Sequence, residues 1–261
     1  MFLENNKGAV YYSVNGPEKA PLVVFTHGIT MDHTAFDDQV DALQGQFQVL
    51  VWDLPGHGLS FSLNGPFSYS LAEECLIGLL DELDAEQVVT VGVSLGGQIN
   101  QYLAHNHPER VSALVEVGSL ALHKGFGPLA REMGSLYVKM SSLIPKNMVY
   151  SSFSKSKGVK TNTQAYLKKQ AERMGKDQLL RITKDMVDDV AGGISDPVKQ
   201  PLLIVHGEKE AFFVASHLKK WHDETPGSRF AVIPDAGHVA NMDNPEFFNK
   251  VIGSFLEEIC L

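Results

Sequence analysis

The chain has 261 residues, of which 44% are hydrophobic, so it is long and apolar enough to bury a sizeable core as one domain. Its formal net charge of −9 argues against nucleic acid or an anionic membrane as a partner, because those surfaces attract clustered Lys and Arg. The chain has no basic N-terminal segment with a sustained apolar stretch, no run as long as a membrane span, and two cysteines without a disulfide or metal-binding pattern, which together predict a cytoplasmic protein.

The N-terminal part of the chain alternates between strand and helix patterns. Apolar and β-branched runs predict strands over residues 8–14, 22–26, 48–52, 87–91 and 111–117. Amphipathic patterns predict helices over residues 36–43, 70–83 and 95–105. Such alternation is typical of an α/β fold with a mostly parallel sheet and helices on both faces.

The motif Gly-Val-Ser-Leu-Gly occupies residues 92–96, between an apolar strand and a helical pattern. A serine that projects from the end of a strand must turn so sharply that its φ becomes positive, which costs about 1–3 kcal/mol at a non-glycine residue. Gly92 and Gly96 leave room across that turn, and Gly97 lets the helix pack closely. This context predicts Ser94 as a nucleophile. Without partner residues elsewhere, a plain Gly/Ser-rich loop would explain the motif equally well.

The alternation stops between residues 122 and 198. This stretch is rich in helical pattern, has a polar interval over residues 151–163, and carries Met133, Met140, Met148, Met174 and Met186. We predict a helical cap over residues 122–198, inserted into a core made of residues 1–121 and 199–261. Because methionine adapts its shape to irregular ligands, a cap lined by these residues would suit an apolar acyl group. Each of them could instead fill the core of the cap.

Strand order resumes near the C-terminus. Strands are predicted over residues 201–207 and 229–233, and a helical pattern begins at Asn244. Glu210 follows the first of these strands, and His238 lies on the loop after the second. In an open parallel sheet the loops after the strands meet at one edge, so Ser94, Glu210 and His238 are expected to come together there.

The order nucleophile, acid, histidine resembles that of the α/β-hydrolase superfamily. The resemblance covers nearly the whole chain, and besides the serine motif it rests on His27-Gly28, Asp53 to Ser60, Pro108 to Val111, and Gly237-His238. It implies the α/β-hydrolase fold. Most relatives carry Asp where this chain has Glu210, but a loop shift can absorb one more methylene, and some acyl-homoserine lactonases of this fold look similar here.

The resemblance implies a serine hydrolase that cleaves a small-molecule carboxylic ester or lactone through an acyl-enzyme, with no cofactor and no metal. His238 would take the proton of Ser94, and Glu210 would orient the imidazole. The geometry of the family implies that the backbone N–H groups of Ile29 and Leu95 form the oxyanion hole. A monomer or homodimer is expected. A carbon–carbon bond hydrolase, a peroxidase-like activity and a small-molecule receptor with slow turnover stay open, because the pattern of the cap does not separate them.

Other acidic residues compete for the role of the triad acid. Glu116 falls within a predicted strand, and Glu208 is only one residue past the end of another. Asp235 and Asp243 flank His238 in sequence, but residues adjacent on a loop seldom point at the same ring. These positions make Glu210 the favoured acid.

Several further histidines and aromatic residues have simpler readings. His105 and His107 near Glu109 could suggest a metal, but a solvated helix end explains them better. His57 lies in a Gly/Pro turn that has no lysine to bind a phosphate, so this turn is predicted to be a structural loop. His27 is expected to support the oxyanion loop. Four phenylalanines could line an acyl pocket or belong to the core: Phe36, Phe126, Phe212 and Phe213.

Overall fold

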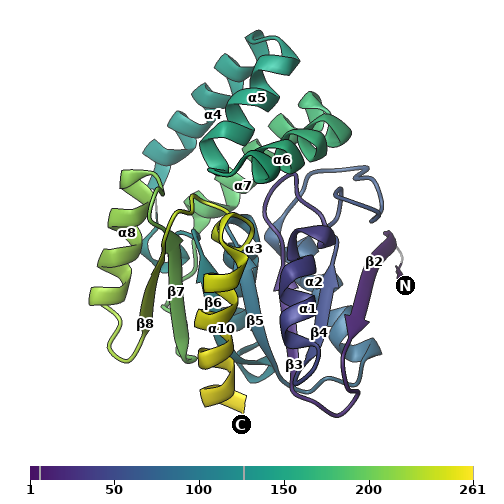
Figure 1. Ribbon diagram of the computed structural model, residues 1–261. Helices are drawn as coiled ribbons and strands as arrows, with labels where there is room; N and C mark the ends of the chain where they lie inside the picture. Colours follow the sequence, from purple (N-terminus) through teal and green to yellow (C-terminus); the bar gives the residue numbers. More distant parts are fainter. Residues whose placement is uncertain (6, 126, 261) are drawn as a thin grey trace.

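A single eight-stranded sheet forms the centre of the protein in the computed structural model, which describes residues 1–5, 7–125 and 127–260 (Figure 1). The strand order is β1-β2-β4-β3-β5-β6-β7-β8. The strands are β1 (Phe2–Asn5), β2 (Gly8–Asn15), β3 (Leu22–Thr26), β4 (Gln48–Trp52), β5 (Val88–Val93), β6 (Val111–Val117), β7 (Leu202–Gly207) and β8 (Arg229–Ile233). Strand β2 pairs antiparallel with both β1 and β4, and β3 to β8 form a parallel array.

Helices cover both faces of the sheet (Figure 1). The α-helices outside residues 122–198 are α1 (Asp37–Leu43), α2 (Tyr69–Glu82), α3 (Leu95–Asn106), α8 (Phe212–Asp223), α9 (Ala240–Asp243) and α10 (Pro245–Cys260). Successive residues of a strand point to opposite faces, so Val23 belongs to the apolar cluster that includes α1 and α10, whereas Val24 belongs to the cluster that includes α2, α3 and α8. This arrangement confirms the predicted α/β fold.

Helices α4 (Gly127–Leu143), α5 (Lys146–Lys157), α6 (Thr161–Met174) and α7 (Lys176–Gly192) lie between β6 and β7 in the chain. They stand together above one edge of the sheet, which is the edge where β5, β6 and β7 end (Figure 1). The helical content expected there is therefore present. The division of the chain into a core and a cap over residues 122–198 stays a prediction.

The structure differs from the predicted elements at several boundaries. The helix expected from residue 36 begins with a 3₁₀ turn at His33–Phe36, because the side chain of Asp32 caps that turn by accepting from Thr34 N. Strand β5 reaches Val93 and so leads directly into Ser94. Strand β1 and helix α8 were not predicted from the sequence, because their hydrophobic patterns are too short or too mixed to stand out. Among the helices of the described residues, none is long and apolar enough to cross a membrane.

Candidate active site

Ser94 occupies a strained turn between β5 and α3. Its φ of 54° and ψ of −114° confirm the positive φ expected from the motif. The backbone N–H of Ser94 donates to Val117 O at 2.8 Å, and its carbonyl accepts from Ser119 Oγ at 3.0 Å. These bonds to β6 and the loop after it hold the serine in a conformation that a free chain would avoid.

The glycines around Ser94 are required by close packing. A Cβ atom at Gly96 would overlap the carbonyl oxygen of Thr26, and one at Gly97 would overlap Ser119 Oγ. The first turn of α3 therefore lies directly against the end of β3. Any side chain at these positions would push α3 away from the sheet.

We expect Gly96→Ala to lower the free energy of unfolding by about 3 kcal/mol or more, since the obstacle is backbone rather than a movable side chain. Gly253→Ala is the matched control, because a Cβ at Gly253 in α10 would meet nothing within 4 Å. Urea unfolding of both variants measures the difference. Equal stability of the two variants would contradict the close packing at Gly96.

His238 and Glu210 form a buried pair at the ends of β8 and β7. His238 Nδ1 lies 2.7 Å from Glu210 Oε2, and the side chains are 6% and 3% exposed. Glu210 Oε1 accepts from Ala211 N at 2.8 Å. Because the carboxylate accepts, Nδ1 carries the proton and Nε2 is left as the basic atom. The Nε2 atom makes no hydrogen bond to any described residue. In particular, it makes none to the hydroxyl of Ser94.

The electrostatics of the pair favour a neutral imidazole beside a carboxylate. Burial and the nearby charge of Lys157 lower the pKa of His238, and Glu210 opposes them only in part. Burial raises the pKa of Glu210, but the hydrogen bonds from His238 and Ala211 N and the nearby positive charges together outweigh it, so the net pKa is lowered. Near neutral pH His238 is therefore a free base.

The competing acids lie elsewhere. Glu116 is buried beneath α3, where Gln101 Nε2 donates to it at 2.9 Å, and burial raises its pKa well above the ordinary value. Glu208 accepts from Asp235 N at 3.0 Å, and Asp235 forms an ion pair with Lys209. In the part of the chain that the structure describes, none of these carboxylates bonds to His238.

Asp243 also binds backbone rather than the imidazole. Its carboxylate accepts from Gly237 N, Val159 N and Lys160 N, each at 2.9 Å at its shortest. Gly237 precedes His238, whereas Val159 and Lys160 follow α5. This buried carboxylate therefore ties the histidine loop to the helices above the sheet, a role that the sequence did not reveal.

His27 supports the loop that carries Ile29. Its Nε2 accepts from Leu54 N at 3.1 Å, so its Nδ1 carries the proton and donates to Gly28 O at 2.8 Å. Burial lowers the pKa of His27 and keeps it neutral. Ile29 lines the pocket that also contains Ser94, and Leu95 N is the first amide of α3, where amides lack intrahelical acceptors. The assignment of these two amides as oxyanion donors stays a prediction.

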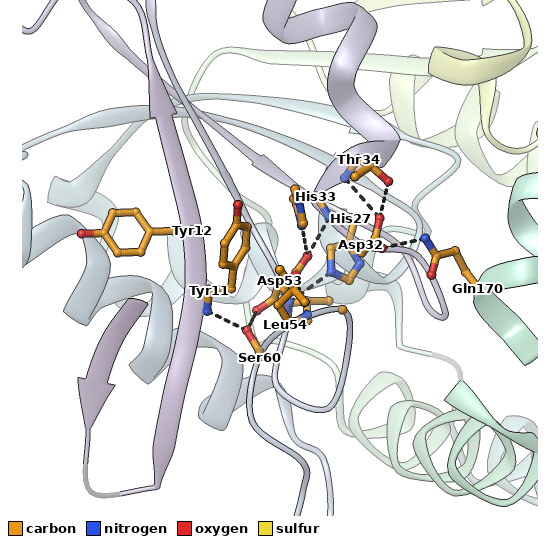
Figure 2. A network of polar contacts seen from close by, with 12 residues as sticks. Tyr11, Tyr12, His27, Asp32, His33, Thr34, Asp53, Leu54, Ser60 and Gln170 are labelled. Atoms are coloured by element: carbon orange, nitrogen blue, oxygen red, sulfur yellow. Dashed lines mark hydrogen bonds and ion pairs between the residues drawn. The ribbon is translucent and has the colours of Figure 1, made fainter. Parts of the chain in front are cut away.

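Two aspartates fix the rest of this loop (Figure 2). Asp53 accepts from His33 N at 2.7 Å and from its Nδ1 at 2.9 Å. Asp32 accepts from Gln170 Nε2 at 2.6 Å and from the hydroxyl of Tyr166 at 3.0 Å, both on α6. Hydrogen bonds therefore hold this loop to Asp53 on one side and to α6 on the other.

A pocket of about 390 Å³ is lined by most of the predicted site residues. Ser94, Glu210, His238 and Ile29 all line it. The remaining wall is mainly apolar and comes largely from α4 to α8: Tyr137, Val149, Phe153, Leu167, Leu179, Leu180, Met186, Phe213 and Val214. The pocket therefore brings together residues that follow the ends of four strands, β3, β5, β7 and β8.

Three of the five methionines take neither predicted role, because they neither line the pocket nor fill the core of the helices. Met186 lines the pocket, but Met133, Met140 and Met148 are 58–64% exposed on the outside of α4 and α5. Met174 packs against the core at partial burial. The pattern of a helix does not tell which apolar face meets the sheet, because that depends on how the helix docks.

The phenylalanines divide in a similar way. Phe213 lines the pocket, whereas Phe36 is fully buried against Phe25 and Phe212 is 86% exposed. Phe126 lies outside the described residues. Phe36 therefore belongs to the core and Phe212 to the surface.

The other histidines show no metal site. His107 lies 3.8 Å from Glu73 and 3.7 Å from Glu109 at the exposed end of α3. His57 is buried in its loop, where burial lowers its pKa to about 3. Over the described ranges, no group of three or more His, Cys, Asp and Glu side chains could hold a metal ion.

Residues 23–251 match the family model described as the alpha/beta hydrolase family. Among curated proteins, the chain is 25% identical to 3-oxoadipate enol-lactonase 1 of Acinetobacter baylyi over 99% of this chain and 97% of that protein. Among solved structures, it is similar to an esterase from Exiguobacterium antarcticum, with a TM-score of 0.83 and 20% identity over 98% of each chain. Est816, described as an N-acyl homoserine lactone degrading enzyme, gives a TM-score of 0.79 at 22% identity over 98% of this chain and all of that one.

Proposed function

Because this chain belongs to the alpha/beta hydrolase family, we propose that it is a serine hydrolase that cleaves a carboxylic ester or lactone through a Ser94–Glu210–His238 triad. One observation carries the proposal: His238, hydrogen-bonded to Glu210 through Nδ1, shares a pocket with a serine held at positive φ. The lactonase and esterases among similar proteins support an ester or lactone as the substrate class.

The proposed reaction begins when His238 Nε2 takes the proton of Ser94 and the serine oxygen attacks the substrate carbonyl. The backbone amides of Ile29 and Leu95 would stabilise the resulting oxyanion, and each such donor is typically worth about 2.7–4 kcal/mol. Glu210 would stabilise the imidazolium. The intermediate then collapses, the leaving oxygen takes the proton from His238, and water hydrolyses the acyl-enzyme by the same steps.

The test is a steady-state assay with short-chain p-nitrophenyl esters and a panel of lactones. We expect sustained turnover of at least one of these classes, with saturation by substrate. A single burst of product followed by no further turnover would instead favour a receptor that keeps the triad. The expected cytoplasmic location and the monomeric or dimeric state stay predictions.

The pH dependence of the reaction should follow His238. Since burial and Lys157 lower its pKa from the ordinary 6.5, the imidazole stays neutral to lower pH, and kcat/KM should fall only below pH 6.5. A pH profile of kcat/KM for one p-nitrophenyl ester, from pH 4.5 to 8.5, measures the midpoint of this decline. A midpoint above 6.5 would mean that Glu210 outweighs burial and Lys157.

A further inference from the structure

Lys157 is the one lysine or arginine among the described residues that line the pocket of Ser94 and His238. It is the last residue of α5 and is only partly exposed. Within the described part of the chain, its ammonium group makes no hydrogen bond or ion pair. The mainly apolar pocket thus contains a positive charge that the protein itself leaves unpaired.

The backbone at Lys157 is fixed to the loop that carries His238. The carbonyl of Lys157 accepts from Val239 N at 3.3 Å. Asp243 then bonds both to Val159 N and to Gly237 N, which follow Lys157 and precede His238 in the chain. These bonds keep the start of the Lys157 side chain beside the proposed catalytic base.

Glu210 cannot serve as the partner of this ammonium in the observed arrangement. One of its oxygens is bonded to His238 and the other to Ala211 N, and no ion pair joins it to Lys157. Lys157 nevertheless lines the same pocket as His238 and Glu210, and its charge lowers the pKa of each. An unpaired ammonium that is partly shielded from water is unfavourable, and an anion in the pocket would relieve that cost.

We propose that Lys157 binds a carboxylate carried by the substrate, so that this enzyme acts on anionic esters or lactones. The inference rests on the proposed function, because it names the substrate class of the same site. The carboxylate could belong to the acyl part or to the alcohol part of the substrate. Both would present the same group to the ammonium, and the two can be separated by experiment.

The experiment compares two pairs of esters. The acyl pair is mono-p-nitrophenyl glutarate and p-nitrophenyl pentanoate, and the alcohol pair is 4-carboxyphenyl butanoate and 4-carbamoylphenyl butanoate. For Lys157→Met, we expect the ratio of kcat/KM values, charged ester over neutral ester, to fall about 10- to 100-fold in one pair, mainly through KM. That pair identifies which part of the substrate carries the carboxylate. Taking the ratio removes any general effect of Lys157 on His238.

Two further variants separate charge from structure. Lys157→Arg should retain most of the ratio because it keeps a cation, and Lys155→Met, at an exposed lysine of the same helix, should leave it unchanged. Thermal unfolding checks that Lys157→Met folds. An unchanged ratio in both pairs for a folded Lys157→Met, or an equal fall in Lys155→Met, would overturn the inference.

A binding measurement keeps the inference separate from the proposed reaction. Calorimetric titration with glutarate requires no turnover, and we expect its affinity to be about tenfold or more weaker for Lys157→Met than for the wild type. If the wild type hydrolyses no ester or lactone but glutarate binding depends on Lys157, the proposed function fails and the anion site stands. If glutarate does not bind, or binds both proteins equally, the anion site fails whatever the esterase result.

Discussion

Ser94→Ala is expected to lower kcat for ester hydrolysis by about 10⁴-fold or more, and His238→Ala should do the same. The two residues act as one unit, because without the base the serine hydroxyl is a poor nucleophile and without the serine the base has nothing to activate. The double variant should therefore lose little more than either single variant. Steady-state kinetics of the three proteins tests this expectation.

The matched structural control is the stability of Ser94→Ala. Alanine at φ 54° is strained as serine is, so the free energy of unfolding should change little. A fluorophosphonate probe should label the wild type at Ser94 and should not label the variant. Near-normal activity of Ser94→Ala, or a labelled peptide from another part of the chain, would place the nucleophile elsewhere.

Glu210→Gln is expected to lower kcat by about 10²- to 10⁴-fold with only a modest change in KM. The amide can keep a contact with His238 Nδ1, but it supplies no negative charge to the imidazolium and permits the wrong tautomer. The loss should therefore appear in the chemical step rather than in binding. The measurement is again kcat and KM on a p-nitrophenyl ester.

Glu116→Gln provides the control at a second buried glutamate. Burial raises the pKa of Glu116 well above its ordinary value, which favours the uncharged form, and glutamine has nearly the same shape as that form. We expect nearly unchanged kcat and KM. The opposite outcome, with Glu116→Gln inactive and Glu210→Gln active, would move the acid to β6.

Local chemistry explains what the sequence by itself determined. Hydrophobic patterns predicted the parallel strands and their helices, since a strand buried on both faces is apolar at most of its positions. The glycines around Ser94 predicted its positive φ, because only they leave space across so tight a turn. The order of strand ends was also enough to predict that Ser94, Glu210 and His238 would share one edge.

Contacts between distant segments explain what only the tertiary structure decided. Asp32 accepts a hydrogen bond from Gln170, 138 residues away in the chain, and Asp243 accepts one from Val159, 84 residues away. Neither pairing produces a periodic pattern in the sequence. The docking of α4 and α5 likewise left Met133 and Met140 outside and brought Lys157 into the pocket. A helix with several apolar stripes can bury any of them, so the rigid-body position of the helix, and not its sequence pattern, determined which side chains line the pocket.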